Sequence, residues 1–82
     1  MIIINVEVPV LDKKYDVRVN ETVQLVKIRN ELIDLICREE QCQVEGDRNR
    51  FLFYDVNSHR MLDLSLSAYE NNLKTGQSVI LA

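Results

Sequence analysis

The chain has 82 residues, enough for one domain whose single hydrophobic core buries roughly 60–65% of the surface that the unfolded chain exposes. Hydrophobic residues make up 46% of the chain and charged residues 28%, a composition that excludes the weakly hydrophobic, highly charged class of disordered chains. The formal net charge of −3, with ten basic and thirteen acidic residues interspersed, provides no basic footprint. We therefore expect no nucleic-acid partner.

The apolar stretches are too short for a membrane protein. None approaches the roughly 20 residues that cross a bilayer, and Asn5 and Glu7 interrupt the opening run Met-Ile-Ile-Ile. No basic segment flanks that run. We expect neither a signal peptide nor an anchor, and no direct insertion into a membrane.

The cysteine pattern favours a reducing compartment. Cys37 and Cys42 lie near the end of an expected helix, and His59 stands alone elsewhere. A disulfide or half of a metal site is one interpretation of the pair. Reduced structural thiols are the other, and we favour them because cytosolic chains rarely carry stable disulfides. We expect a cytoplasmic protein without a metal or another cofactor.

Two alternating segments occupy the first twenty residues. From Ile2 to Val8 one face is apolar and the other is mixed, which is the period of a half-buried strand. Pro9 ends this strand, and after a loop through residues 12–14 the alternation returns from Tyr15 to Val19. The two segments predict a β-hairpin. Its inward residues are expected to be Ile2, Ile4, Val6, Val8, Tyr15, Val17 and Val19.

An amphipathic helix is predicted from Val23 to about Glu40, with Thr22 as its N-cap. Arg29 falls near the middle of the apolar stripe. We favour a stem that packs while the guanidinium reaches the edge, and a buried contact with a partner is the alternative. The apolar stripe consists of Leu25, Val26, Ile28, Leu32, Ile33, Leu35, Ile36 and Cys37.

A strand that is apolar on both faces is predicted from Arg50 to Val56, after a loop that Gly46 closes. Such a strand is either covered twice or keeps one face for a partner. The sequence does not distinguish whether Phe51 and Phe53 or Leu52 and Tyr54 face outward.

The remaining elements are short. Residues 57–59 predict a turn, residues 61–64 a short strand, and residues 64–73 a winding segment with a helical turn. The turn at Lys74-Thr75-Gly76 uses a glycine that can adopt positive φ. In the last strand Val79 and Leu81 are expected to face the core and Ile80 the other side.

This order of elements predicts an α+β fold in which one helix packs across a mixed sheet of four to five strands, as a single domain over residues 1–82. The helix must cover the apolar face of the hairpin, and the last apolar strand needs a paired position inside the sheet. A ubiquitin-like β-grasp satisfies both requirements.

Specific residues carry a family resemblance. Tyr15-Asp-Val-Arg-Val19 before a helix, and Leu73-Lys-Thr-Gly-Gln-Ser-Val-Ile-Leu81 at the end, resemble the YukD/EsaB family of small bacterial ubiquitin-like proteins. The resemblance to ubiquitin itself covers nearly the whole chain and includes Thr22-Val23 at the helix start and Leu66-Ser-Ala-Tyr69 before the last strand. The YukD/EsaB resemblance implies an accessory or regulatory role in type VII secretion in Gram-positive bacteria. A related domain is fused to a membrane protein of the actinobacterial apparatus.

The family pattern differs in detail from this chain. YukD/EsaB proteins usually have Gly-Asp before the last strand, whereas this chain has Gly76-Gln77, and its loop before Leu73 is about two residues longer. The shared motifs are turn and core positions. They therefore imply the fold more directly than the function, and no functional residue is carried over.

Other chemistries of this superfold need residues that the sequence does not offer. Protein modifiers and sulfur carriers act through a C-terminal Gly-Gly, whereas Val79-Ile-Leu-Ala82 ends the chain, so we expect a non-conjugating module. Plant-type ferredoxins need four cysteines. His59 is expected to be a solvated turn residue because catalysis would also need an orienting partner. We expect no enzymatic activity.

Surface recognition is the function that remains. We expect a protein partner on the outer face of the sheet, with the candidate surface Ile3, Arg50, Leu52, Tyr54 and Ile80. Arg48, Arg50 and Arg60 are candidates to rim that face, although isolated surface charges are commonly only solvated. The alternative is that the irregular segment or a homodimer covers the face.

Two functions therefore follow from the sequence. The first is an accessory or regulatory module of type VII secretion that docks on a membrane component or ATPase of the apparatus. The second is a ubiquitin-like domain unrelated to secretion, which mediates self-assembly, adapts other proteins or neutralises a toxin.

Overall fold

The computed structural model describes residues 1–41 and 50–82. The chain forms strand β1 (Ile2–Val8), 3-10 helix η1 (Pro9–Leu11), strand β2 (Lys13–Val19) and helix α1 (Leu25–Glu39). Three short strands follow, β3 (Phe53–Asp55), β4 (Arg60–Met61) and β5 (Ser78–Leu81). Gly46, Cys42 and Arg48 lie outside the described residues, so the expected loop closure, the expected reduced state of Cys42 and the place of Arg48 in the basic rim stay predictions.

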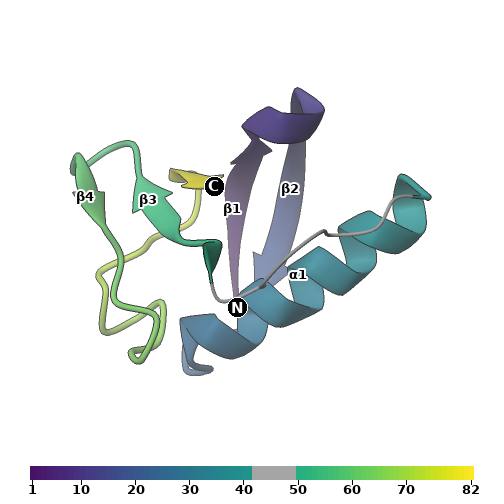
Figure 1. Ribbon diagram of the computed structural model, residues 1–82. Coiled ribbons are helices and arrows are strands. Elements are labelled where there is room, and N and C mark those ends of the chain that lie inside the picture. The colour runs from purple at the N-terminus through teal and green to yellow at the C-terminus, as the bar shows by residue number, and fades with distance from the viewer. Residues whose placement is uncertain (42–49) are drawn as a thin grey trace.

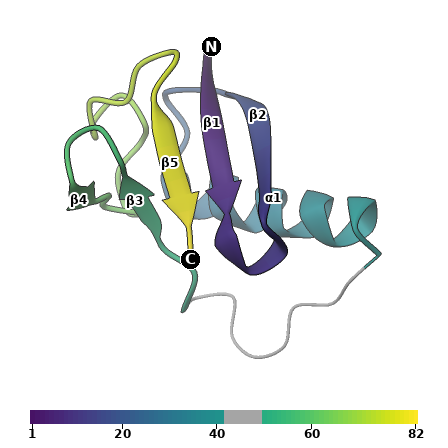
Figure 2. The same ribbon diagram turned by 90° about the horizontal axis from the view of Figure 1, so that it is seen from above.

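The five strands form one mixed sheet in the order β2-β1-β5-β3-β4. β1 pairs in parallel with β5, and the other neighbouring pairs are antiparallel. Helix α1 lies across one face of this sheet, and no helix formed by residues 1–41 or 50–82 lies over the other face (Figures 1 and 2). This arrangement is the expected ubiquitin-like β-grasp with one helix on a mixed sheet.

The core lies between α1 and the sheet, and it follows the two periodicities of the sequence. Alternate residues of the strands and residues three or four apart in α1 point into the same layer. Ile4, Val6, Val79 and Leu81 are almost completely buried, because β1 and β5 occupy central positions. Leu35 departs from the expected stripe, since 45% of it is exposed at the edge of the helix.

The start of α1 differs from the prediction that Thr22 caps it. The Thr22 hydroxyl donates to Asn20 Oδ1 at 2.7 Å, and the helix begins three residues later at Leu25. Backbone carbonyls satisfy the first helical N–H groups instead: Leu25 N donates to Leu66 O at 2.9 Å and Val26 N to Leu64 O at 3.0 Å. The irregular segment therefore replaces a side-chain cap.

Arg29 corrects a second expectation. Only 3% of the residue is exposed, so the guanidinium does not reach the edge. Nε and Nη2 donate to Asn30 Oδ1 at 3.2 and 3.1 Å, and Nη1 donates to Phe51 O at 3.4 Å. Arg29 thus links the middle of α1 to the segment that leads into β3, where burial without such partners would be costly.

Residues 64–73 form the winding segment that the sequence predicts, and residues 62 and 63, which were expected in a strand, belong to it as well. The predicted helical turn is reduced to the hydrogen bond from Asn71 N to Ser67 O at 3.1 Å. Ser67 and Glu70 make a reciprocal pair, in which Ser67 N donates to Glu70 Oε1 and Glu70 N to Ser67 Oγ, both at 3.1 Å. Asn71 is buried, accepts from Asp63 N, and donates to Asp63 O and Ser67 O, each at 2.9 Å. Side-chain amides therefore satisfy backbone groups that no strand or helix pairs.

The short elements are shorter than expected. The predicted strand over residues 50–56 is reduced to Phe53–Asp55, and the predicted strand over 61–64 becomes Arg60–Met61. The final turn is as predicted: Gly76 has φ 91° and Gln77 N donates to Lys74 O at 3.2 Å. Across the described ranges 1–41 and 50–82, no helix combines the length and the apolarity that a bilayer crossing requires.

We predict that Asn71→Asp destabilises the fold by about 2–4 kcal/mol, because the new carboxylate oxygen would face two carbonyl acceptors in a buried site. Urea unfolding measures the change. Asn72→Asp is the matched control, since Asn72 is exposed and its φ of 61° suits Asp as well. An equal loss of stability in both variants would contradict the structural role of Asn71.

The hydrogen bonds of Asp63 contribute to the free energy of unfolding in a way that depends on pH. Ser65 Oγ and Ser65 N donate to Asp63 Oδ1 at 2.6 and 2.9 Å, and the hydroxyl first, then the amide, lowers the pKa of Asp63 below its ordinary value. Because the folded pKa is the lower one, this contribution is present above the ordinary pKa of about 3.9 and is lost as the pH falls through the folded pKa. We expect Ser65→Ala to raise the pKa of Asp63 in an NMR carboxyl titration, and an unchanged pKa would contradict the assignment.

Candidate protein-interaction surface

The structure shows which side of β3 faces outward. Phe53 and Asp55 point inward and are only 1% and 2% exposed. Leu52 and Val56 are exposed and Tyr54 is half-buried on the opposite side. The alternative left open by a strand that is apolar on both faces is therefore decided: Leu52, Tyr54 and Val56 belong to the outer face of the sheet.

The strand register gathers apolar side chains around Tyr54. Tyr54 lies opposite Ile80 of β5 on one side and opposite Met61 of β4 on the other. Paired residues share a face, so these three form a row across three strands. Leu52 and Val56 lie two positions before and after Tyr54 on the same face. We call this surface the β3 patch: Leu52, Tyr54, Val56, Met61 and Ile80.

Polar residues border the β3 patch on its β1 side. Ile80 lies opposite Glu7, and Glu7 lies opposite Lys14 of β2. In the neighbouring row Ser78 lies opposite Asn5, whose Nδ2 donates to Asp16 Oδ1 at 3.3 Å. The outer face therefore changes from apolar over β3, β4 and β5 to polar over β1 and β2.

Ile3 is separated from the other candidate residues. It is 45% exposed on the outer face, but it lies opposite Arg18 and beyond Asn5. Glu7 is the β1 residue that lies beside Ile80. Four residues along β1 correspond to roughly 13 Å at the usual strand rise. The structure thus brings together Leu52, Tyr54 and Ile80, and leaves Ile3 outside the β3 patch.

The basic residues named with this surface have different surroundings. Arg50 is exposed two positions before Leu52, at the end of the β3 patch. Arg60 lies opposite the inward-facing Asp55, and its guanidinium donates to Asn71 O and to Ser58 Oγ, the latter at 3.2 Å. Arg60 thus holds the β3–β4 turn to the irregular segment, whereas Arg50 is exposed beside the β3 patch.

Met61 and Val56 were not among the predicted surface residues, although they are 52% and 37% exposed. Their signal was present as apolar residues on either side of a predicted turn. Met61 belongs to the β3 patch because the β3–β4 register places it opposite Tyr54, and a pattern of neighbouring residues does not predict that register.

The side chains that could serve as nucleophiles, bases or metal ligands lie apart from one another among the described residues. His59 is exposed in the β3–β4 turn with φ 56°. Cys37 is half-buried and packs against the core. Within residues 1–41 and 50–82, no three His, Cys, Asp or Glu side chains come together as a metal site. The β3 patch is therefore the candidate site that the described residues form.

Comparison with solved structures supports the fold assignment. The chain resembles a ubiquitin-like domain of an Arabidopsis thaliana protein at 16% identity and a TM-score of 0.72, covering 99% of this chain and 74% of that one. It resembles the EccD5 ubiquitin-like domain from Mycobacterium xenopi at 14% identity and a TM-score of 0.71, covering 99% and 91%. For the UBL domain of Plasmodium falciparum Dsk2 the values are 13% identity, a TM-score of 0.64, and coverage of 99% and 97%.

No protein-family model and no curated protein sequence matches the chain significantly. The structural likenesses lie at low identity and therefore establish the fold alone. The chain has the ubiquitin-like β-grasp fold.

Proposed function

We propose that this chain is an accessory or regulatory module of a type VII secretion system, and that it binds a protein partner non-covalently through the β3 patch. The observation that carries the proposal is the gathering of five apolar side chains on the outer sheet face, beside a polar surface over β1 and β2. Apolar clusters with a polar rim are typical of protein interfaces.

The assignment to secretion has two supports. The segments Tyr15–Val19 and Leu73–Leu81 resemble the YukD/EsaB family, whose members serve type VII secretion in Gram-positive bacteria. The fold is also similar to the EccD5 ubiquitin-like domain, which comes from a type VII secretion system. Both supports favour a role in the bacterial cytoplasm, next to the membrane apparatus.

The chemistry of the β3 patch favours a particular partner. Its central residues, Tyr54 and Ile80, are half-buried and lie side by side on the outer sheet face. Arg50 at one end and Glu7 at the border supply charges for the rim. We expect a membrane component or ATPase of the apparatus to bind with roughly micromolar affinity, as small transient interfaces do.

The test is site-specific photocrosslinking in the native cells. A photoreactive residue replaces Met61, which is exposed on the edge strand β4. The control position is Lys27, which is exposed on α1, over the opposite face of the sheet (Figure 1). We expect the Met61 probe to capture a secretion-system membrane protein or ATPase that the Lys27 probe does not capture.

A substitution makes this test quantitative. We expect Ile80→Asp to weaken binding of the captured partner at least tenfold, which corresponds to about 1.4 kcal/mol, because a carboxylate would be desolvated at the centre of the interface. Lys27→Asp should leave the affinity unchanged. Thermal unfolding verifies that both variants fold.

Two outcomes would contradict the proposal. If the Met61 probe captures only a second copy of the chain, self-assembly through the β3 patch replaces the role in secretion. If Ile80→Asp folds and binds normally, the β3 patch is not the interface.

A further inference from the structure

No strand formed by residues 1–41 or 50–82 pairs with the outer edge of β2, which we call the open edge. β2 is the first strand of the sheet, and within the described residues β1 is its strand partner. Asn5 N donates to Gln77 O, and Gly76 N donates to Ile3 O, so these residues of β1 direct their backbone groups toward β5. Ile4 and Val6, which alternate with them, direct theirs toward β2.

The register then identifies the free backbone groups of β2. Val17 and Tyr15 lie opposite Ile4 and Val6, so they exchange hydrogen bonds with β1. The alternating residues direct their N–H and C=O groups to the open edge: Lys14, Asp16 and Arg18. Such an edge can pair with an added strand.

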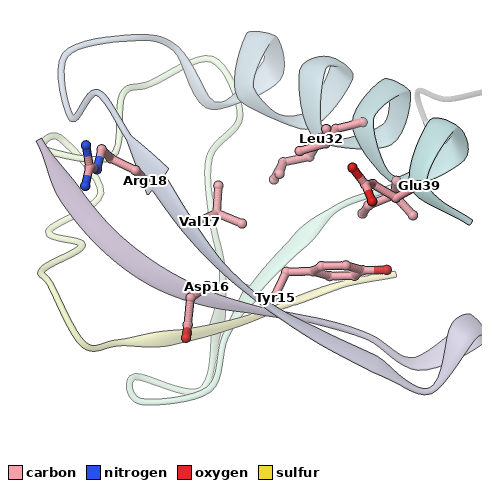
Figure 3. Close-up of a pocket in the computed structure, with 8 residues that line it drawn as sticks. Tyr15, Asp16, Val17, Arg18, Leu32 and Glu39 are labelled. Carbon is pink, nitrogen blue, oxygen red and sulfur yellow. The ribbon is translucent and has the colours of Figure 1, made fainter.

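A groove runs beside this edge, between β2 and α1 (Figure 3). It contains two hollows of about 420 and 320 Å³. Val17, Arg18, Leu32 and Leu35 line both hollows. Leu32 and Val17 face the space between helix and strand, whereas Asp16 points away from the helix (Figure 3). The exposed position of Leu35 places an apolar side chain on the helical wall of this groove.

The hollows follow one another along β2. Tyr15 and Ile36 belong to the first, and Val19 and Ile28 belong to the second. In an added strand, the side chains that face the groove recur every second residue, about 6.6–7 Å apart. One apolar residue can therefore enter each hollow while the backbone pairs with the edge of β2.

The charges that line the groove indicate which residues would flank the two apolar residues of an added strand. Glu31 lines one hollow and Glu39 the other, and both are exposed. Neither carboxylate has a hydrogen-bond or ion-pair partner among the described residues, whereas Glu40 is occupied by Tyr15 and Lys13. The helical wall therefore carries two carboxylates, whereas Arg18 of β2 lines both hollows on the strand side. Basic side chains on an occupant are complementary to the helical wall.

We propose that the open edge of β2 and the β2–α1 groove bind an extended peptide segment of a partner protein, which adds as a strand. The segment carries two apolar residues separated by one residue and flanked by Lys or Arg. This groove lies at the edge of the sheet opposite β4, so it is distinct from the β3 patch and leaves that patch free for a second partner.

A second copy of the chain fits this edge less well. Antiparallel pairing of two β2 strands over their full length centres on Asp16. It places Asp16 opposite Asp16 and Lys14 opposite Arg18. Like charges directly opposite each other destabilise a strand pair. The groove-facing residues of that copy, Tyr15 and Val17, already pack against its own core.

The experiment is selection of a library of nine-residue peptides displayed on phage against the whole chain, followed by NMR mapping of a synthetic selected peptide. We expect enrichment of two apolar residues with one residue between them and basic flanks. Binding should shift the α1 resonances of Leu32 and Leu35, and it should slow hydrogen exchange of the Lys14, Asp16 and Arg18 amides.

Variants test separately the apolar wall of the groove and its acidic charge. We expect Leu35→Asp to lower the affinity for the selected peptide at least tenfold. We expect Glu39→Lys to lower this affinity about threefold to tenfold, and to bind more tightly a version of the peptide with glutamates in place of the basic flanks. Glu7→Lys makes the same charge change on the outer sheet face and should have little effect. Thermal unfolding controls for the fold.

Several results would overturn the proposal. The first is a library that shows no enrichment, and the second is a selected peptide that shifts the resonances of the β3 patch and not those of α1. The third is hydrogen exchange of the β2 amides that is as fast in the complex as in the free chain. The fourth is a dimer formed through β2 that Leu35→Asp abolishes.

Discussion

The parallel pairing of β1 with β5 is the constraint on which the other features depend. It places the last strand in the middle of the sheet, so that Val79 and Leu81 join Ile4 and Val6 in the core. With β5 fixed, the β5–β3 register directs Phe53 inward and Tyr54 outward. The same order leaves β2 and β4 as edges. The β3 patch and the open edge of β2 are therefore two consequences of one pairing.

Polar side chains hold the parts of the fold that regular structure does not. Residues 62–73 cover the start of α1, and their carbonyls receive its first N–H groups, so this segment takes the place of a helix cap. Asn71 in turn satisfies the backbone of the segment, and Arg29 joins α1 to the approach to β3. A small domain has few apolar contacts to spare, and buried polar groups with full sets of partners give it a unique arrangement.

Local patterns predicted the β-grasp because strand and helix periods are properties of neighbouring residues. The inward faces of β1 and β2, the positive φ at Gly76 and the outward position of Ile80 were all readable in this way. Contacts between distant segments were not. The carbonyls of Leu64 and Leu66, and not Thr22, accept the first N–H groups of α1. Phe51 O accepts a hydrogen bond from the buried Arg29, and the β3–β4 register places Met61 beside Tyr54. The surface was thus predicted in part: Leu52, Tyr54 and Ile80 lie together, and Ile3 lies apart.

The most direct test of this account is a nuclear Overhauser spectrum of the whole chain, because the β1–β5 register and the outward face of β3 both depend on the same cross-strand proximities. We predict contacts of the Tyr54 ring with the methyl groups of Ile80 and Met61, together with backbone contacts between Val6 and Val79. Contacts of the Phe53 ring with Met61 and Ile80, in place of those of Tyr54, would contradict it, because they would turn the β3 patch into the core.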